Sequence, residues 1–452
     1  MTSSAQATAR WEPVLSGEVA ERARESVERV VRVLERDPEA HGSGFSLAAG
    51  TAGLAVAIGY LSRVLERPAL MDGALGFLDR AVGGLASSTS GPGLYSGFTG
   101  VAWAAAHLQA VGLLEPDDVD IYEEIDAALL KLLEDSHRPR TYDLISGLVG
   151  TGVYALERWP HPRAERILEV VVGRIAAMRE ARAAGVTWKT AAELLHADQH
   201  RQAPHGYYNL GLAHGVPGIL GFLARARGAG ALNPEGERIL EAGIDWLLEQ
   251  KRDLGHGLRF TYWLPAGTAQ RVKGSRVAWC YGDLGVAAAL LVAGASCGRP
   301  DWSRQAVAVA RDCVAVDPRH TGVKDHGLCH GAAGLGHLFN RMAQISGDRT
   351  LRTAARVWLE KTLEMRVPGT GIDGYAFWTA RDRQAEKPAS ADFGFARETG
   401  FLNGAAGVAL ALAAGFSHVD PEWDRVLLIS SGFPNARKPA PAASPPERGA
   451  RS

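Results

Sequence analysis

The sequence carries one short motif seven times, and this repetition constrains its fold more than any other feature. The motif is G-x-x-G followed by an apolar run, with first glycines at Gly50, Gly97, Gly147, Gly215, Gly282, Gly331 and Gly404. Successive copies lie 47, 50, 68, 67, 49 and 73 residues apart. Such a series is typical of an architecture that repeats one supersecondary unit. Glycine is abundant, 53 of 452 residues, and the seven copies of the motif supply 14 of them.

The segments between the motifs predict amphipathic helices. One face of residues 117–135 carries Ile121, Ile125, Leu129, Leu132 and Leu133. Residues 236–251 and 350–365 show the same helical period. Because no convincing period-2 strand pattern appears, each unit is expected to be a hairpin of one amphipathic helix and one apolar, small-residue helix. Seven hairpins closed into a ring, with the apolar helices inside, give an all-α fold, an α/α toroid.

We expect one toroid domain over residues 16–432, a disordered N-terminus over 1–15 and a disordered Pro/Ala-rich tail over 433–452. The three longer motif spacings predict insertions, which we place near residues 184–210, 253–275 and 366–399. Each insertion precedes an inner helix, so all three should lie on the face where inner helices begin. Insertions gathered on one face usually mark a binding face.

Composition limits the kinds of binding partner and the cellular compartment expected for this chain. A net charge of −1 disfavours nucleic-acid binding. Four cysteines in so long a chain indicate no disulfide scaffold, and with no apolar secretory signal at the N-terminus they predict a cytoplasmic protein. Two stretches, 42–62 and 399–419, lack charged residues but are rich in glycine and alanine. They predict helices buried in a large fold, not membrane spans.

Aligning the repeats on their first glycine locates a candidate metal site. Two positions earlier stand Ala48, Tyr95, Ile145, Ala213, Cys280, Cys329 and Leu402. Consecutive inner helices pack roughly 8–10 Å apart, so Cys280 and Cys329 should meet, and His330 adds a third donor. Two thiolates and one imidazole suit Zn²⁺ and leave one coordination position open, as in catalytic zinc sites. The alternative, buried cysteines that fill the core beside a structural histidine, stays open at this point.

Three of these motifs resemble those of the LanC lanthipeptide cyclases. They are LAHGVPG (212–218), WCYGDLG (279–285) and CHGAAGL (329–335), in this order. Three further segments are similar to the stand-alone type, which works beside a separate dehydratase. They are NLGLAHG (209–215), GFLNGAAGVALAL (400–412) and WDRVLLIS (423–430). The resemblance spans roughly residues 40–432.

The resemblance implies an α/α toroid with one zinc ion per chain, held by Cys280, Cys329 and His330. The implied reaction is a Michael-type addition of a peptide cysteine thiol to a dehydroalanine or dehydrobutyrine of the same peptide. Its product is a lanthionine or methyllanthionine ring. The implied partners are a dehydrated precursor peptide with a leader segment and a separate dehydratase, and a transporter can join them. We expect no fused dehydratase, because 452 residues leave no room for one.

The resemblance also carries acid/base positions over to Asp143 and His214, and it adds Arg276 and Tyr281, which flank the first zinc cysteine. We assign His214 as general acid/base and Asp143 as the group that fixes its tautomer. Arg276 could stabilise an enolate oxygen, and Tyr281 could donate a proton or a hydrogen bond. Structural roles remain open for each: a hydrogen-bonding histidine, a helix cap, a surface salt bridge and ring packing.

Other functions compete with this one. Addition of glutathione or another free thiol to dehydroamino acids would use the same residues. A zinc-stabilised peptide-binding scaffold in a synthetase complex would keep the metal but would not need His214. A prenyltransferase-like toroid needs clustered Lys and Arg for a lipid diphosphate, and none stand beside the zinc repeats. A toroidal glycosidase is disfavoured because the helix-start column holds no pair of carboxylates.

Overall fold

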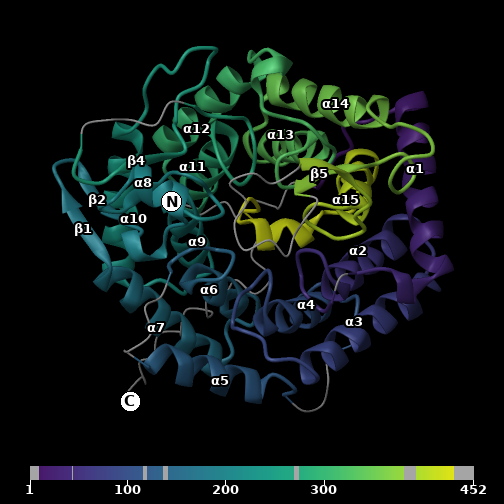
Figure 1. Cartoon of the computed structure of the whole chain (residues 1–452), viewed down its shortest axis with the longest axis horizontal. Helices are drawn as coiled ribbons and strands as arrows, with labels where there is room; N and C mark the ends of the chain where they lie inside the picture. The colour runs from purple at the N-terminus through teal and green to yellow at the C-terminus, as the bar shows by residue number, and fades with distance from the viewer. Residues whose placement is uncertain are drawn as a thin grey trace, which may run out of the picture.

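The computed structural model describes residues 10–42, 44–115, 120–135, 141–268, 274–380 and 393–431, and in them the long helices form two concentric rings (Figure 1). The inner ring consists of α2 (Thr51–Val64), α4 (Phe98–Ala110), α6 (Leu148–Glu157), α9 (Val216–Gly228), α11 (Asp283–Cys297), α13 (Ala332–Ser346) and α15 (Ala405–Phe416). The outer ring consists of α1 (Gly17–Arg36), α3 (Leu70–Ala86), α5 (Glu123–Glu134), α7 (Pro162–Ala177), α10 (Pro234–Glu249), α12 (Pro300–Val314) and α14 (Arg349–Glu364). Because α15 packs against both α13 and α2, the inner ring closes, and the predicted α/α toroid is confirmed.

Each inner helix begins directly after the first glycine of a motif, which is its N-cap residue. Repeat 2 shows why both glycines are needed. A Cβ on Gly97 would overlap the carbonyl oxygen of Gly91, and a Cβ on Gly100 would overlap that of Leu94. A Cβ on Gly100 would also come 3.0 Å from Leu47 Cβ of repeat 1. The motif therefore lets each connector turn tightly under its own helix and against the neighbouring repeat.

The turns that precede the inner helices are joined into a closed ring of backbone hydrogen bonds. The donor and acceptor residues are Ala48 to Tyr95, Tyr95 to Ile145, Leu144 to Ala213, Ala213 to Cys280, Cys280 to Cys329, Cys329 to Leu402, and Leu402 to Ala48. The N–H to oxygen pairs are 2.9 to 3.4 Å long. This is the column in which the sequence alignment places the two cysteines, so the ring sets Cys280 beside Cys329.

The connectors before α9, α11 and α15 contain short strands, which the sequence did not predict. The strands are β1 (Arg179–Arg182), β2 (Gly185–Trp188), β3 (Tyr207–Asn209), β4 (Trp263–Pro265), β5 (Phe377–Ala380) and β6 (Phe393–Ala396). They form the antiparallel pairs β1–β2, β3–β4 and β5–β6, with Tyr208 opposite Leu264 in the second pair. Runs of three or four residues are too short to display a period of two. The first insertion also contains α8 (Ala197–Gln202) and begins at β1, earlier than predicted.

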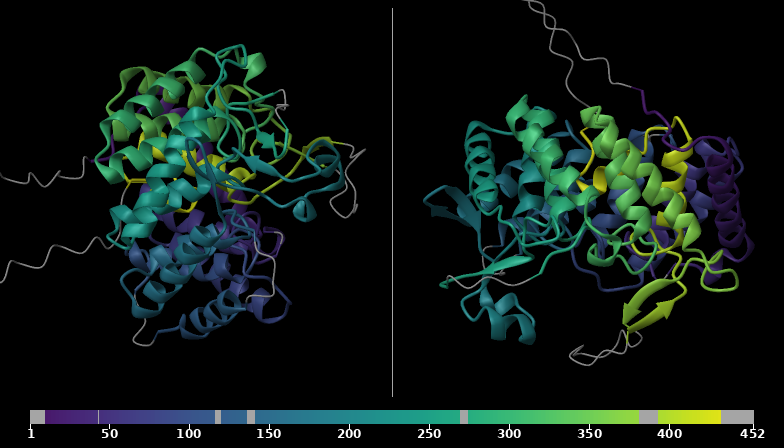
Figure 2. Two further views of the ribbon diagram at one scale, coloured as in Figure 1. Left: turned by 90° about the vertical axis from the view of Figure 1, so that its left-hand side faces the viewer. Right: turned by 90° about the horizontal axis from the view of Figure 1, so that it is seen from above.

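The insertions gather at the end of the ring where the inner helices begin. Figure 2 shows β4 and the β5–β6 pair projecting from this end. The pairing of β3 with β4 joins the first insertion to the second. Short 3-10 turns at Pro38–Ala40, Ala192–Leu194 and Pro318–His320 complete the connectors. β3, β4 and the β5–β6 pair therefore lie on the expected face, whereas β2 of the first insertion packs against outer helix α10.

A segment near the C-terminus fills the centre of the ring. Its 3-10 helix η5 (Glu422–Leu427) is the yellow segment at the centre of Figure 1. Two residues of the turns before α4 and α11 bind it through side-chain hydrogen bonds to backbone carbonyls. Tyr95 Oη donates to Val426 O at 3.0 Å, and Trp279 Nε1 donates to Leu427 O at 2.9 Å. The toroid therefore has a packed centre rather than an open lumen.

Buried ion pairs also hold this segment. Arg425 Nη1 lies 2.9 Å from Glu157 Oε1 of α6, and Asp424 Oδ2 lies 2.8 Å from Arg341 Nε of α13. Burial alone would raise the pKa of Glu157, but the neighbouring His107 and Arg425 lower it to about 2. Because both carboxylates are paired, the segment can carry charge into the core without the full desolvation penalty.

Two expectations about the outer parts of the chain need correction. Residues 10–15 are ordered: Trp11 is buried, its Nε1 donates to Ala414 O at 2.9 Å, and Val14 and Leu15 pack nearby. Residues 1–9 and 432–452 lie outside the described residues, so the predicted disorder there stays a prediction. The sequence pattern predicts Ile121 on the apolar face of a helix over residues 117–135. It is instead 54% exposed, because α5 begins only at Glu123, two residues after it.

The two charge-free stretches form α2 and α15, and nearly every residue of both helices is buried. Their small residues let neighbouring helices pack closely around them. No helix in the described part of the chain is both long and apolar enough to cross a membrane.

Candidate metal and catalytic site

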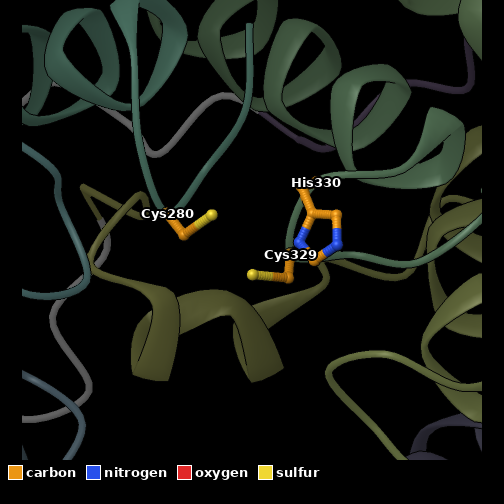
Figure 3. Close-up of side chains that lie close together, drawn as sticks. All are labelled: Cys280, Cys329 and His330. Carbon is orange, nitrogen blue, oxygen red and sulfur yellow. The ribbon is translucent and has the colours of Figure 1, made fainter. Parts of the chain in front are cut away.

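The turns before α11 and α13 bring three possible metal ligands together. The sulfurs of Cys280 and Cys329 and a ring nitrogen of His330 all lie within 4.8 Å of one another (Figure 3). Each cysteine is 8% exposed, whereas the His330 side chain is 25% exposed. The predicted convergence of these three side chains is confirmed, and the partly open histidine leaves the group accessible from one side.

The chemistry of this donor set fits a thiophilic metal ion. Two thiols and one imidazole are soft to intermediate ligands of the kind that bind Zn²⁺. Both cysteines are free thiols. The group could therefore hold a metal ion with Cys280, Cys329 and His330 as ligands, and three protein ligands leave a further position for another molecule.

The two thiols affect each other's ionisation. Contact with the Cys329 thiol lowers the pKa of Cys280 well below its usual value, and His330 and Arg276 add to this effect. The same contact raises the pKa of Cys329, and burial raises it further. One thiolate therefore forms readily while its neighbour holds its proton. A bound cation would favour the ionised form of both.

His214 and Asp143 form a hydrogen-bonded pair at the neighbouring turn, which Ala213 joins to Cys280 by a backbone hydrogen bond. His214 Nδ1 lies 3.1 Å from Asp143 Oδ2, while Asp143 Oδ1 accepts hydrogen bonds from the backbone N–H groups of Ser146 and Gly147 at 2.8 and 3.0 Å. The carboxylate thus both caps its turn and contacts the histidine, one role for each oxygen. Burial would raise the pKa of Asp143, but these hydrogen bonds outweigh it and lower the pKa, so the carboxyl stays ionised.

Tyr281 and Arg276 stand on either side of the first cysteine. The Tyr281 ring lies against His214, with ring centroids 6.1 Å apart, and its hydroxyl accepts a hydrogen bond from Asn209 Nδ2 at 3.1 Å. Burial raises the pKa of Tyr281, so its hydroxyl stays protonated. Arg276 Nη2 donates to Gly322 O at 3.1 Å, and its buried Nε has no hydrogen-bond partner among the described residues.

Sequence reasoning missed two buried polar residues that touch this constellation. Asn209 contacts Tyr281, and Asp325 lies 4.0 Å from His330 Nε2. Both stand six residues before a motif's first glycine, and Arg276 holds the same place in the repeat between them. The alignment could have revealed this second column, in which three consecutive repeats carry Asn, Arg and Asp.

A second group of possible metal ligands differs from the first because an arginine already pairs with its carboxylates. Asp120, Asp126 and His161 also approach one another, but Arg158 donates to both carboxylates. The guanidinium already balances their charge. This group is an ion-pair network that links α5, the end of α6 and the start of α7, so it does not compete with the cysteine site.

Comparisons with known proteins agree with this architecture. The family model for "Lanthionine synthetase C-like protein" matches residues 43–428. The chain is 22% identical over 366 residues to "Nisin biosynthesis protein NisC" of Lactococcus lactis subsp. lactis, covering 75% of this chain and 78% of the relative. The solved structure named "Nisin cyclase" superposes with a TM-score of 0.72 at 18% identity, over 92% of this chain and 98% of that one. The chain belongs to the lanthionine synthetase C-like family.

Proposed function

We propose that this protein is a lanthipeptide cyclase. It would add a cysteine thiol of a precursor peptide to a dehydroalanine or dehydrobutyrine of the same peptide and form a thioether ring. The observation that carries the proposal is the convergence of Cys280, Cys329 and His330 beside the His214–Asp143 pair. Family membership and the similarity to a protein named for nisin biosynthesis support the same reaction.

The metal proposed for this site is zinc, one ion per chain, held by Cys280, Cys329 and His330. Bound there, zinc would supply a Lewis acid that favours the thiolate form of a peptide cysteine, whose thiol otherwise has a pKa of about 8.5. The His330 side chain is partly exposed, so a peptide can approach the group from that side.

His214 is the proposed general acid/base. Its Nδ1 faces the ionised Asp143, so we assign the proton to Nδ1 and leave Nε2 free to exchange a proton. His214 alone can carry out both proton transfers. Nε2 accepts the proton of the peptide thiol, sulfur bonds to Cβ of the dehydroamino acid, and Nε2 returns a proton to Cα. The His214 side chain is 41% exposed, so a substrate can reach it.

Arg276 and Tyr281 are the proposed stabilisers of the intermediate charge. Attack at Cβ places negative charge on the carbonyl oxygen of the dehydroamino acid, and a positioned donor lowers that barrier. Arg276 has a buried Nε without a hydrogen-bond partner among the described residues. The protonated hydroxyl of Tyr281 is held by Asn209 and can donate its hydrogen to the same oxygen or to a nearby amide.

The proposed partners follow from this chemistry. The substrate would be a dehydrated precursor peptide with a leader, and a separate dehydratase must introduce the double bonds before cyclisation. A transporter that exports the product is a further proposed partner. The cytoplasmic location stays a prediction from the sequence.

The decisive experiment is incubation of the purified protein with the dehydrated precursor, followed by alkylation of the remaining thiols and mass spectrometry. Ring formation leaves the peptide mass unchanged and removes alkylation sites, so we expect fewer alkylated cysteines than in the untreated peptide. Addition of glutathione would instead increase the peptide mass by one glutathione per adduct. Unchanged thiols in the presence of bound zinc would leave a peptide-binding scaffold as the better description.

A further inference from the structure

Asp325 lies between His330 and the third insertion. Its side chain is 2% exposed, and each oxygen accepts one backbone hydrogen bond. Oδ1 accepts from Gly327 N at 2.9 Å, and Oδ2 accepts from Trp378 N of β5 at 3.0 Å. These two bonds hold the carboxylate in one orientation at the base of the turn that carries Cys329 and His330.

The turn itself does not require a negative charge. In repeat 4 the corresponding residue is Asn209, whose Oδ1 accepts a hydrogen bond from Gly211 N at 2.8 Å in the same geometry. A neutral amide oxygen is therefore enough to build the turn. In repeat 6 the second oxygen also accepts a backbone N–H, from Trp378, which the NH2 of an amide could not do, so the two bonds together favour a carboxylate. Each carboxylate oxygen can accept more than one hydrogen bond, so Oδ2 can still take a further donor as a partner.

His330 is that partner by position. Its Nε2 lies 4.0 Å from Asp325 Oδ2, and Figure 3 shows the other ring nitrogen, Nδ1, on the side of the two sulfur atoms. The distance is longer than a direct hydrogen bond, and a small rotation of the imidazole or one water molecule would bridge it. Ligand histidines commonly donate their second N–H to a carboxylate, which fixes the tautomer and the ring orientation.

We propose that Asp325 is a positioning residue for the metal site. It accepts a hydrogen bond from Nε2–H of His330, directly or through one water, and so keeps Nδ1 directed at the space between the two thiols. Because Asp325 also binds Trp378 N, it ties the orientation of this ligand to the start of the β5–β6 insertion. The inference rests on the proposed zinc site and adds a residue that controls its affinity.

The test is the Zn²⁺ affinity of the full chain, measured by competition with a chromogenic chelator. Asp325→Asn should weaken binding by about 10- to 100-fold. In a His330→Cys background, which keeps three ligands but has no second N–H, the same substitution should have no further effect, because the group through which Asp325 acts is gone. Asp317→Asn is the matched control: this partly exposed aspartate of the same connector also accepts a turn hydrogen bond, from Arg319 N at 2.9 Å, and its loss should leave affinity unchanged.

An equal loss of affinity in both backgrounds would overturn the proposal, since Asp325 would then act through the turn or through β5. Wild-type affinity in Asp325→Asn would overturn it as well. A wild-type chain that binds no Zn²⁺ would remove the proposed metal site itself, and the wild-type titration alone reveals that failure. The ¹⁵N NMR spectrum of His330 in the zinc-loaded wild type requires no Asp325 variant: we expect metal-bound Nδ1 and protonated Nε2, and metal-bound Nε2 would contradict the proposal.

Discussion

The turns of repeat 1 and repeat 6 have the same backbone arrangement but carry different side chains. Repeat 1 reads Leu-Ala-Ala-Gly over 47–50, and repeat 6 reads Leu-Cys-His-Gly over 328–331. In both, the leucine is buried, the glycine caps the inner helix, and the residue after the leucine joins the ring of backbone hydrogen bonds. The fold therefore fixes the first and last positions of the turn and leaves the two between them free to carry reactive groups.

Repeat 5 departs from this common geometry. Its first glycine, Gly282, has φ of +93°, whereas the other six first glycines have φ between −99° and −146°. Asp283, which follows it, accepts backbone hydrogen bonds from Arg259 and Phe260 of the second insertion. The turn that supplies Cys280 is thus shaped by an insertion as well as by the repeat. Single substitutions can show which of these differences belong to chemistry and which to the scaffold.

The largest effect is expected from Cys280→Ala, which removes a reactive group but keeps the turn. Zinc should fall from about one equivalent per chain to almost none, because two protein ligands hold the ion poorly. Metal analysis of the purified protein measures this. Cys313→Ala is the control: Cys313 is buried in α12 of the outer ring and is not one of the three converging ligands, so this variant should keep its zinc. Full zinc content in Cys280→Ala would refute the proposed ligand set.

His214→Asn should separate metal binding from catalysis. The variant should retain zinc, and its rate of ring formation should fall by about 10²- to 10⁴-fold because the general acid/base is lost. Free-thiol counting over time gives the rate. The control is His161→Asn in the outer ring at the start of α7, which should cyclise at the wild-type rate. Undiminished cyclisation by His214→Asn would reassign this histidine to a structural role.

Gly282→Ala tests the distorted turn of repeat 5. A Cβ there would overlap the carbonyl oxygen of Arg276, and the positive φ strains any side chain. We expect the free energy of unfolding in urea to fall by about 3 kcal/mol or more. Gly76→Ala in α3, where a Cβ would meet nothing within 4 Å, should be neutral or stabilising by up to about 1 kcal/mol. Similar unfolding curves for the two variants would show that the turn adapts.

The smallest effect concerns Asp283 and the pH dependence of stability. Burial raises its pKa to about 6, despite the hydrogen bonds from Phe260 and Arg259. The native state then holds this proton to higher pH than the unfolded state does, so its stabilising contribution is complete below about pH 4 and declines as the pH rises to about 6. Relative to Asp283→Asn, the wild type should lose about 1–3 kcal/mol between pH 4 and pH 7. A constant difference between the two unfolding free energies would contradict this.

The sequence predicts those parts of the molecule that depend on the repeat. All seven inner helices begin where the motif places them, and the column that holds Cys280 and Cys329 is the hydrogen-bonded ring of the structure. The parts that depend on contacts between distant residues could not be predicted. Strands β3 and β4 lie in different insertions, and η5 reaches the centre through ion pairs such as Arg425 with Glu157. Neither leaves a periodic pattern in the local sequence.

The candidate site was predictable to the same extent as the fold, namely where it depends on the repeat. The residues at fixed offsets from a glycine, including His214 and Tyr281, could be aligned and placed. Asn209, which contacts Tyr281, and Asp325, which lies near His330, also stand at a fixed distance in sequence from a motif glycine. Their importance depends on which side chain each of them contacts. Those contacts depend on how β3 and β5 pack within their insertions. The repeat pattern does not encode that packing.

The central segment has a consequence for biosynthesis. Residues 420–431 are translated after every helix of both rings, and yet Tyr95 of repeat 2 and Trp279 of repeat 5 donate their hydrogen bonds to this segment. While the ribosome is still making the last repeat, the nascent toroid therefore lacks its core filling, and Glu157 lacks its arginine partner. Closure of the ring must come late, which makes the unfinished chain a natural client for chaperones that shield apolar surface.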